Sequence, residues 1–562
     1  GDMGDKYSIG IDFGTLSARA ILINNRTGEE ILSSVYGYQD GVIEKYLNSP
    51  KIKLPLDYAL QNPLDYKDAV IALLKDLTSN SGLNPSDIIS IGLDFTACTV
   101  MAVDEKMTPL CVNCKFSGNP HSWVKLWKHH GAQEEADRIN KVAIERNEKF
   151  LKYYGNTSSS EWMLAKILET YRKAPEVYQA AIRFVEAGDW VVWLLTGEET
   201  TSTCMAGYKA FWNAETGYPS AEYLEAVEPG FSSVLGKLTS RVSMVGSRAG
   251  GLTEKMAAAT GLIKGTSVAV AMIDAHSPMP LFASAGGNIL LMSMGTSSCH
   301  ILLSKKEILA GGICGVVRDG VIPGYYGYEA GQAAVGDIYD WFITNLASND
   351  CYQEASKRNI SPFAVMDEKA ANLEPGKSGL IALDWWNGNR SMLNNSNLSG
   401  MIVGLTLNSS QEELYRAIIE ATAYGTRNII EAMENQGIQI DHIYACGGLS
   451  RKSALVMQIF ADVIGREIAT AAIEQTTAFG AAMYGMIAAG KSRGGYDSFG
   501  EMGRLLQIEK GAIFRPNKKN HKIYNELFAF YQKLADHFGI YNKDIMESLK
   551  KMRTKRYAER KN

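Results

Sequence analysis

Residues 7–23 combine glycine, hydroxyl and carboxylate side chains in a spacing that could bind phosphate. The stretch has the pattern of a strand, a turn and a second strand, and the turn contains Gly14, Thr15 and Ser17, with Asp12 just before it. Because glycine has no Cβ, its backbone N–H is open to close approach, and with the hydroxyls it can cradle phosphate oxygens. Asp12 could hold Mg²⁺ directly or through water, or it could simply cap the turn.

Residues 288–303 repeat this pattern in the second half of the chain. Aligned without gaps, the pairs are Gly14 with Gly295, Thr15 with Thr296, Ser17 with Ser298, and Asp12 with Ser293. Two such turns facing each other could hold both ends of a triphosphate, although chance also produces a shared Gly-Thr-x-Ser. The repetition predicts two domains built on one plan.

A third stretch, residues 441–453, places Gly447 and Gly448 between a strand pattern and an amphipathic helix pattern. A glycine pair there lets a flat ring lie against the backbone near a helix N-terminus. The same pair is also typical of an ordinary strand–helix turn.

Asp274 follows a buried apolar strand pattern at residues 267–273. The ends of such strands line crevices in α/β proteins, so an acid there is a candidate base for an attacking hydroxyl. The Asp could equally cap a helix, and the two roles are compatible. His276 lacks a mate at metal-ligand spacing, which favours a structural role.

The elements that would position these residues alternate between strands and helices. Residues 88–94 have the pattern of a buried strand, whereas residues 189–195, 412–433 and 453–464 carry helical spacing. The alternation predicts α/β layers. We place the domain boundary near residue 284, which gives domains 1–284 and 285–562 with a cleft between them.

The composition is that of an ordinary globular protein of more than one domain. The 562 residues are 46% hydrophobic and 21% charged, and 57 Lys and Arg against 61 Asp and Glu leave no general basic surface for nucleic acid. No apolar run is long enough for a membrane span, no signal peptide precedes the first strand, and the eight Cys are scattered. We therefore expect a cytoplasmic protein without nucleic-acid or membrane partners. The basic segment 550–562 is interpreted as a solvated helix end, and a homodimer is compatible with the sequence.

In this order, the elements resemble the FGGY carbohydrate kinases of the actin/hexokinase ATPase superfamily. The resemblance covers about residues 7–490 and implies two ribonuclease-H-like domains with a catalytic cleft between them. Segments that resemble the ribulose-phosphorylating subgroup are 126–130 (LWKHH), 159–162 (SSEW), 206–212 (AGYKAFW), 328–332 (YEAGQ), 382–390 (ALDWWNGNR) and 420–427 (EATAYGTR). One departure is Glu169, which stands three residues after Lys166 where the general family signature has Trp.

The resemblance implies an ATP- and Mg²⁺-dependent kinase that phosphorylates the terminal hydroxyl of a ketopentose, L-ribulose to L-ribulose 5-phosphate in arabinose catabolism. Asp274 would be the catalytic base. The ketopentose would contact Ala97, Trp127, Lys209, Asp274 and Glu329. The nucleotide would contact Asp12, Gly14, Thr15, Ser17, Gly295, Thr296, Gly447 and Gly448, with Asp12 holding Mg²⁺ through water.

Two alternatives stay open at this stage. Another sugar specificity, such as that of a xylulose kinase, fits the same carbon skeleton. A sugar- and ATP-binding regulator without turnover is also compatible, because related folds use these hairpins without being kinases.

Overall fold

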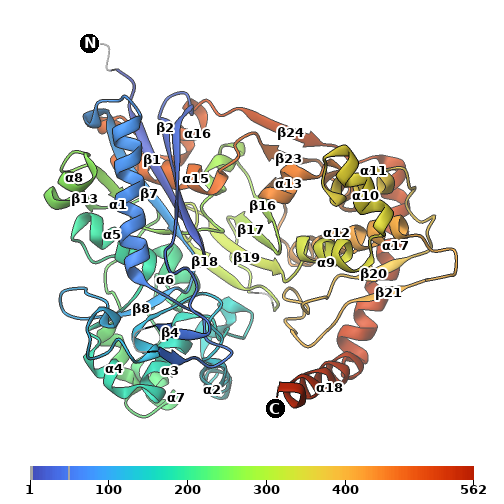
Figure 1. The fold of residues 1–562 in the computed structure, drawn as a ribbon, viewed down its shortest axis with the longest axis horizontal. Helices are drawn as coiled ribbons and strands as arrows, with labels where there is room; N and C mark the ends of the chain where they lie inside the picture. The colour runs from blue at the N-terminus through green and yellow to red at the C-terminus, as the bar shows by residue number, and fades with distance from the viewer. Residues whose placement is uncertain (1–3, 49–50, 310, 562) are drawn as a thin grey trace.

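The computed structural model describes residues 4–48, 51–309 and 311–561, and it contains two seven-stranded sheets flanked by helices (Figure 1). Strands of the first sheet, in spatial order, are β13 (Arg248–Gly251), β14 (Ser267–Ala269), β7 (Ile88–Phe95), β1 (Tyr7–Phe13), β2 (Ser17–Asn24) and β3 (Glu30–Gly37), with β15 (Met272–Ile273) also paired to β7. Strands of the second are β18 (Gly315–Arg318), β19 (Tyr326–Gln332), β17 (Ser298–Ser304), β16 (Ile289–Met294), β22 (His442–Cys446), β23 (Ile468–Ala471) and β24 (Lys510–Phe514).

The two sheets share a common arrangement at their centres. In the first, β7 runs parallel to β1, and β1, β2 and β3 follow as antiparallel neighbours. In the second, β22 runs parallel to β16, and β16, β17 and β19 are likewise antiparallel neighbours. This repeated order confirms the prediction of two α/β domains on one plan. The boundary near residue 284 stays a prediction.

Most predicted elements are present with shifts of one or two residues at their ends. The exception is the apolar run 267–273, predicted as one strand, which forms β14 and β15 with a break at Val270 and Ala271. After the break, β15 pairs with β7 one residue before Asp274. The two-residue strand β15 therefore lies between the break and the predicted base.

The helices cover both sheets and the region between them. They are α1 (Pro63–Asn80), α2 (Gln133–Glu145), α3 (Met163–Lys173), α4 (Pro175–Ala180), α5 (Ala187–Thr196), α6 (Thr203–Lys209), α7 (Ala221–Val227), α8 (Glu254–Thr260), α9 (Gly336–Leu346), α10 (Asn349–Arg358), α11 (Pro362–Ala371), α12 (Gln411–Asn435), α13 (Gly448–Lys452), α14 (Ala454–Ile464), α15 (Thr476–Ala489), α16 (Phe499–Leu505), α17 (Lys518–Asp536) and α18 (Lys543–Lys561). The longest, α12, starts with a capping box in which Ser410 and Glu413 satisfy each other's backbone N–H groups.

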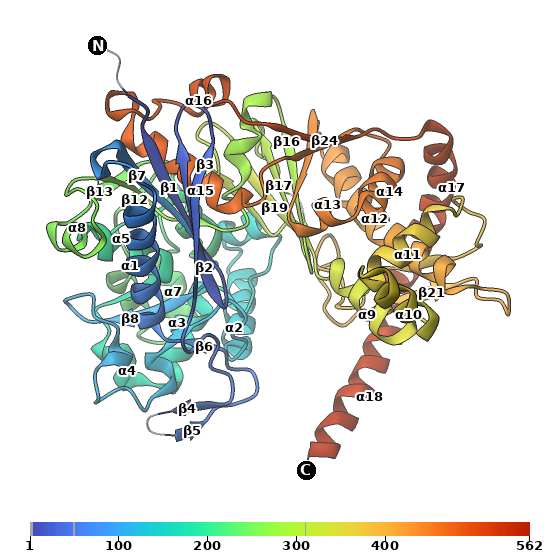
Figure 2. The ribbon, with the colours of Figure 1, turned by 45° about the horizontal axis from the view of Figure 1, so that its top comes forward.

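Short strands complete the structure. They are β4 (Tyr46–Asn48), β5 (Lys51–Lys53), β6 (Leu60–Gln61), β8 (Val100–Val103), β9 (Val124–Lys125), β10 (Arg183–Glu186), β11 (Thr201–Ser202), β12 (Val242–Ser243), β20 (Ile381–Leu383) and β21 (Met401–Val403). Helix α18, which contains most of the basic segment, extends away from the body of the molecule (Figure 2). Within the described ranges, no helix has the length and apolarity required to cross a membrane.

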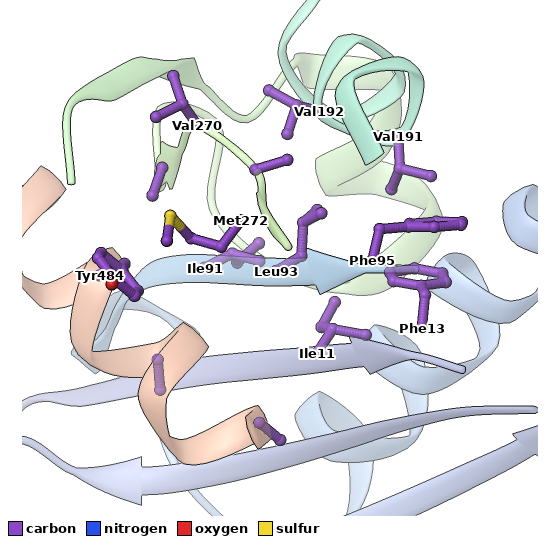
Figure 3. Close-up of a cluster of buried hydrophobic side chains, with 14 of the residues drawn as sticks. Ile11, Phe13, Ile91, Leu93, Phe95, Val191, Val192, Val270, Met272 and Tyr484 are labelled. Atoms are coloured by element: carbon purple, nitrogen blue, oxygen red, sulfur yellow. The ribbon is translucent and has the colours of Figure 1, made fainter. Parts of the chain in front are cut away.

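The hydrophobic core of the first half lies around β1, β7 and β15. Figure 3 shows Val191 and Val192 of α5 above β7, and Tyr484 of α15 beside Ile91. These side chains are at most 1% exposed. Burial of large apolar groups on this scale fixes the strands whose ends carry the predicted acids.

Helix α15 comes from the second half of the chain but packs against β1 and β7. Its approach depends on glycine, because a Cβ at Gly10 or Gly92 would lie 1.8 Å from the carbonyl oxygen of Ala478 or Ala481. Only residues without a Cβ permit such backbone contact. The helix therefore joins the second half directly to the strands of the first.

Candidate active site

Three carboxylates lie together at the carboxyl ends of β1, β7 and β15. Asp12 pairs with Asp94 across β1 and β7, and Met272 of β15 pairs with Asp94 from the other side. The Asp274 backbone N–H donates to the Phe95 carbonyl at 3.0 Å, which fixes its position beside the end of β7. Such an edge of parallel strands is where α/β proteins place reacting groups.

The surroundings of Asp274 suit it to accept a proton near neutral pH. Burial, followed by the charge of Asp12, raises the pKa of Asp274 to about 7, although one carboxyl oxygen accepts the Ala275 N–H at 2.8 Å. Burial and then Asp12 also raise the pKa of Asp94 well above its usual value. Asp94 is fully buried, and neither of its carboxyl oxygens makes a hydrogen bond. A base with a pKa near the working pH is efficient in proton transfer.

The first hairpin tip is held in place by backbone and side-chain hydrogen bonds. The Gly14 N–H donates to the Ser17 carbonyl at 2.8 Å, and the Gln61 side chain donates to the Thr15 carbonyl at 2.7 Å. The Trp127 indole N–H donates to the Thr15 hydroxyl at 3.1 Å, and 38% of the Trp127 residue is exposed. The predicted sugar residue Trp127 is thus attached to the predicted phosphate turn.

The second hairpin tip contacts the start of α9 and the glycine pair. The Gly295 N–H donates to the Ser297 carbonyl at 2.9 Å, and the carbonyls of Gly295 and Thr296 accept backbone N–H groups of residues 335–337. Gly447 has φ 92° and lies so close that a Cβ would be 2.5 Å from the Met294 carbonyl oxygen.

Gly448, the next residue, differs from Gly447. A Cβ at Gly448 would meet nothing within 4 Å, so its backbone is open to a ligand. The structure thereby brings Gly295, Thr296, Gly447 and Gly448 into one region of the second half.

Lys209 and Glu329 meet between the two halves of the chain. The Lys209 ammonium on α6 lies 3.5 Å from a Glu329 carboxyl oxygen on β19, and both side chains are 6% exposed. Burial opposes the charge of Glu329, but Lys209, His276 and Arg390 outweigh it and lower the pKa of Glu329 to about 2. Lys209 also lies over the Trp162 ring at 5.2 Å. The pair offers both donors and acceptors to a polyhydroxyl ligand.

His276 lies beside this pair in a structural position. Its ring stacks on Tyr208 with centroids 4.3 Å apart, and burial lowers its pKa to about 4. Its Nε2 is 3.7 Å from the Glu329 carboxylate.

Buried cations hold the two segments that carry Ala97 and Trp127. The Lys166 ammonium donates to the carbonyls of Cys98 and Leu126, at 2.5 and 2.7 Å, and therefore connects the loop of half-buried Ala97 to the segment of Trp127. Glu169, the departure from the family signature, is fully buried. It accepts hydrogen bonds from Lys125 and His129, on either side of Trp127, at 2.7 and 2.8 Å.

Two residues of the site escaped the sequence analysis. Asp94 ends a recognised buried strand, and the rule that selected Asp274 would have found it. Arg390, which lies 3.9 Å from Glu329, closes the segment 382–390, whose pattern indicates nothing about its position.

The residues around Asp12 fit a magnesium ion. The carboxylate of Asp12 lies beside the unpartnered oxygens of Asp94, and Mg²⁺ prefers oxygen ligands. Within the described part of the chain, no three His, Cys, Asp or Glu side chains are grouped to hold a metal ion by themselves. A cation here would therefore keep water and phosphate oxygens among its ligands.

A pocket between the two halves contains none of the predicted site residues. Its lining includes Tyr153 and Trp212 from the first half and Arg318 and Tyr326 from the second. Its lining shares no residue with the carboxylate cluster or with the Lys209–Glu329 pair.

Two family models match most of the chain up to residue 489. The N-terminal domain of the FGGY family of carbohydrate kinases matches residues 7–279, and the C-terminal domain of that family matches residues 290–489. Curated relatives named ribulokinase include those of Halalkalibacterium halodurans, 47% identical over 98% of both chains, and of Geobacillus thermodenitrificans, 46% identical over 98% of this chain and 97% of the relative.

Solved structures share the fold at low identity. A xylulose kinase from Rhodospirillum rubrum has a TM-score of 0.78 at 22% identity and covers 96% of this chain and 100% of its own. A Plasmodium falciparum glycerol kinase with ADP has a TM-score of 0.74 at 16% identity, covering 94% of this chain and 98% of its own. The two family models and the near full-length relatives establish that the chain belongs to the FGGY family of carbohydrate kinases.

Proposed function

We propose that the protein transfers the γ-phosphoryl group of ATP to the terminal hydroxyl of L-ribulose and forms L-ribulose 5-phosphate. The relatives named ribulokinase, up to 47% identical over 98% of the chain, support the sugar. The observation that carries the chemistry is the carboxylate of Asp274, whose pKa is raised to about 7 at the edge where β1 and β7 end. We also infer that the protein works in the cytoplasm, where ATP and sugar meet.

In this proposal Asp274 accepts the proton of the attacking hydroxyl. Phosphoryl transfer has a loose transition state, so orientation of the hydroxyl and stabilisation of charge make up most of the catalysis. Burial beside Asp12 keeps the Asp274 proton affinity high, so the carboxylate can take the proton as the new bond forms.

The hairpins and glycines hold the nucleotide. Gly14, Thr15 and Ser17 face one part of the phosphate chain, Gly295 and Thr296 the γ-phosphate end, and Gly447 and Gly448 the adenosine. The open backbone at Gly448 supports that last assignment. Asp12 would hold Mg²⁺ through water, and the bound ion would neutralise phosphate charge during transfer.

The sugar occupies the space between the halves. Lys209 and Glu329 supply donors and acceptors for its hydroxyl and carbonyl groups, and Trp127 offers an apolar face to its C–H groups. Ala97 would also contact the sugar. Because Lys209 and Glu329 come from different halves, a sugar that binds both also favours closure, which excludes water from the phosphoryl group.

The test is ADP formation with a panel of ketopentoses. The purified protein with MgATP would be given L-ribulose, D-ribulose, L-xylulose and D-xylulose, and the phosphorylated carbon of the product would be located by NMR. We expect the highest kcat/KM with L-ribulose and phosphate on C5.

Two outcomes would contradict the proposal. A higher kcat/KM with a xylulose isomer would assign the specificity of a xylulose kinase. Sugar binding by calorimetry without ADP formation from any of the four would instead assign a regulator.

A further inference from the structure

The Arg390 side chain lies beside the proposed sugar-binding residue Glu329. Its guanidinium Nη2 is 3.9 Å from Glu329 Oε1, and 41% of the side chain is exposed. The charge of Glu161, from the first half, also reaches this guanidinium. Arg390 therefore faces the space between the halves, where Lys209 and Glu329 meet.

The loop that carries Arg390 is fixed on strand β19. The Ser391 N–H donates to the Gly331 carbonyl at 3.1 Å, and the Gly331 N–H donates to the Ser391 hydroxyl at 3.0 Å. Glu329 and Gly331 are two residues apart on one strand, so they share a face of the sheet. A loop anchored at Gly331 thus brings Arg390 next to Glu329.

Gly331 also provides the space for the guanidinium. A Cβ at this position would lie 3.1 Å from both Cδ and Nη1 of Arg390. That contact is tighter than ordinary van der Waals contact, so a larger residue would displace the arginine. The strand and the loop together place Arg390 beside Glu329.

The groups around Glu329 are close but not tightly hydrogen-bonded. On one oxygen, Lys209 Nζ lies at 3.5 Å and His276 Nε2 at 3.7 Å. On the other, Cys299 Sγ lies at 3.8 Å and Arg390 at 3.9 Å. Strong charge-assisted hydrogen bonds are about 2.7–2.9 Å long. The carboxylate therefore retains acceptor capacity, and the partly exposed guanidinium retains donors.

We propose that Arg390 is a further substrate-binding residue, whose guanidinium donates a hydrogen bond to a sugar hydroxyl that in turn donates to Glu329. The inference rests on the proposed function in that the ligand is a ketopentose. A hydroxyl is both donor and acceptor, so one placed beside the pair can accept from the guanidinium and donate to the carboxylate, whose facing atoms are 3.9 Å apart and do not hydrogen-bond each other. With Glu329 and Arg390, the second half would make two contacts with the sugar.

A role limited to balancing the charge of Glu329 predicts something different. Lys209 lies nearer to the carboxylate than Arg390 does and contributes more to lowering its pKa. Loss of Arg390 alone would then leave Glu329 ionised and sugar binding nearly unchanged. The change in the KM for the sugar on loss of Arg390 therefore distinguishes sugar binding from charge balance.

The experiment compares R390M and R390K with R358M. Arg358 is an exposed arginine on α10 whose ion pairs are with Glu354 at 3.5 Å and Glu368 at 2.7 Å, neither of them a proposed site residue. We expect R390M to raise the KM for L-ribulose about 10- to 100-fold, which is the usual effect of losing a hydrogen bond to a charged group. The KM for ATP and the Tm should stay near wild type, R390K should lie between, and R358M should resemble wild type.

Two results would overturn the inference. One is an L-ribulose KM in R390M within twofold of wild type. The other is an equal loss for ATP and sugar with a lowered Tm, which would assign a structural role. If the wild-type protein prefers another ketopentose, the same comparison is made with that sugar, so failure of the proposed substrate is distinguishable from failure of the Arg390 assignment. If no ketopentose is turned over, sugar Kd values from calorimetry replace KM.

Discussion

The two hairpins β1–β2 and β16–β17 have the same position in their sheets but different tips. In the first, Phe13 pairs with Ala18 and residues 14–17 form the tip, whereas in the second Met294 pairs with Ser298 and residues 295–297 form it. The first tip is one residue longer. Ser17 aligns with Ser298 in an ungapped comparison of the sequences, but by strand pairing the counterpart of Ser298 is Ala18.

The hairpins also differ in the charge beside them. Asp12 pairs with Asp94 across β1 and β7, while the equivalent pair across β16 and β22 is Ser293 with Cys446. In the proposed mechanism, the first half therefore carries the acids for proton transfer and for a cation, and the second half presents neutral groups to the phosphate chain. The two sheets therefore differ in charge at two strand-end positions, which hold Asp12 and Asp94 in the first sheet and Ser293 and Cys446 in the second.

The largest effect is expected when the proposed base of the first half, Asp274, loses its ability to accept a proton. D274N keeps the size of the side chain but cannot accept the proton, so kcat should fall by roughly 10²–10⁴, with sugar binding retained. Steady-state kinetics and calorimetry would measure the two. Exposed Asp137 on α2 provides a control, D137N, expected to behave as wild type. Near-normal turnover in D274N would show that the base lies elsewhere.

The pH dependence of kcat/KM should reflect the raised pKa of Asp274 in the acidic first half. The Asp274 pKa is raised from 3.8 to about 7, so the carboxyl is protonated below pH 7 and cannot act as a base. We expect kcat/KM for the sugar to fall about tenfold per pH unit below this value and to be level above it. A profile from pH 5 to 9 would measure it. A level profile down to pH 5 would contradict the assignment of Asp274.

Placing an acid in the neutral half should harm nucleotide binding. S293D would set a carboxylate near the phosphate chain, and the repulsion should raise the KM for ATP about tenfold, while the sugar KM stays unchanged. S293N has the same size without the charge and is the matched control. An equal rise in both variants would indicate a steric cause and would remove the electrostatic contrast between the hairpins.

The smallest effects separate two neighbouring glycines of the second half. G447A forces a left-handed residue, φ 92°, and a Cβ 2.5 Å from the Met294 carbonyl oxygen, so it should reduce the free energy of unfolding by about 1–3 kcal/mol. G448A has open space and should change it by less than about 0.5 kcal/mol, yet raise the KM for ATP. Urea unfolding and kinetics would measure both. Equal destabilisation would contradict the distinction.

Much of the fold was predictable because its signals are local. Alternating apolar residues and a glycine turn identified both hairpins, and an apolar strand ending in an acid identified Asp274. The same local rule applied to residues 88–94 indicates Asp94 as well. Arg390 had no local signal, since it reaches Glu329 through a loop anchored at Gly331, about sixty residues earlier in the chain.

The amino-acid sequence alone determined the chemical repertoire: two Gly-Thr turns, an acid at a strand end, and the resemblance to one family. Only the tertiary structure brought Lys209 to Glu329, raised the pKa of Asp274, and made one hairpin tip a residue longer than the other. The physical reason is the range of the interactions that decide each feature. Periodicity and turn chemistry depend on neighbours along the chain, whereas burial, charge coupling and strand register depend on neighbours in space.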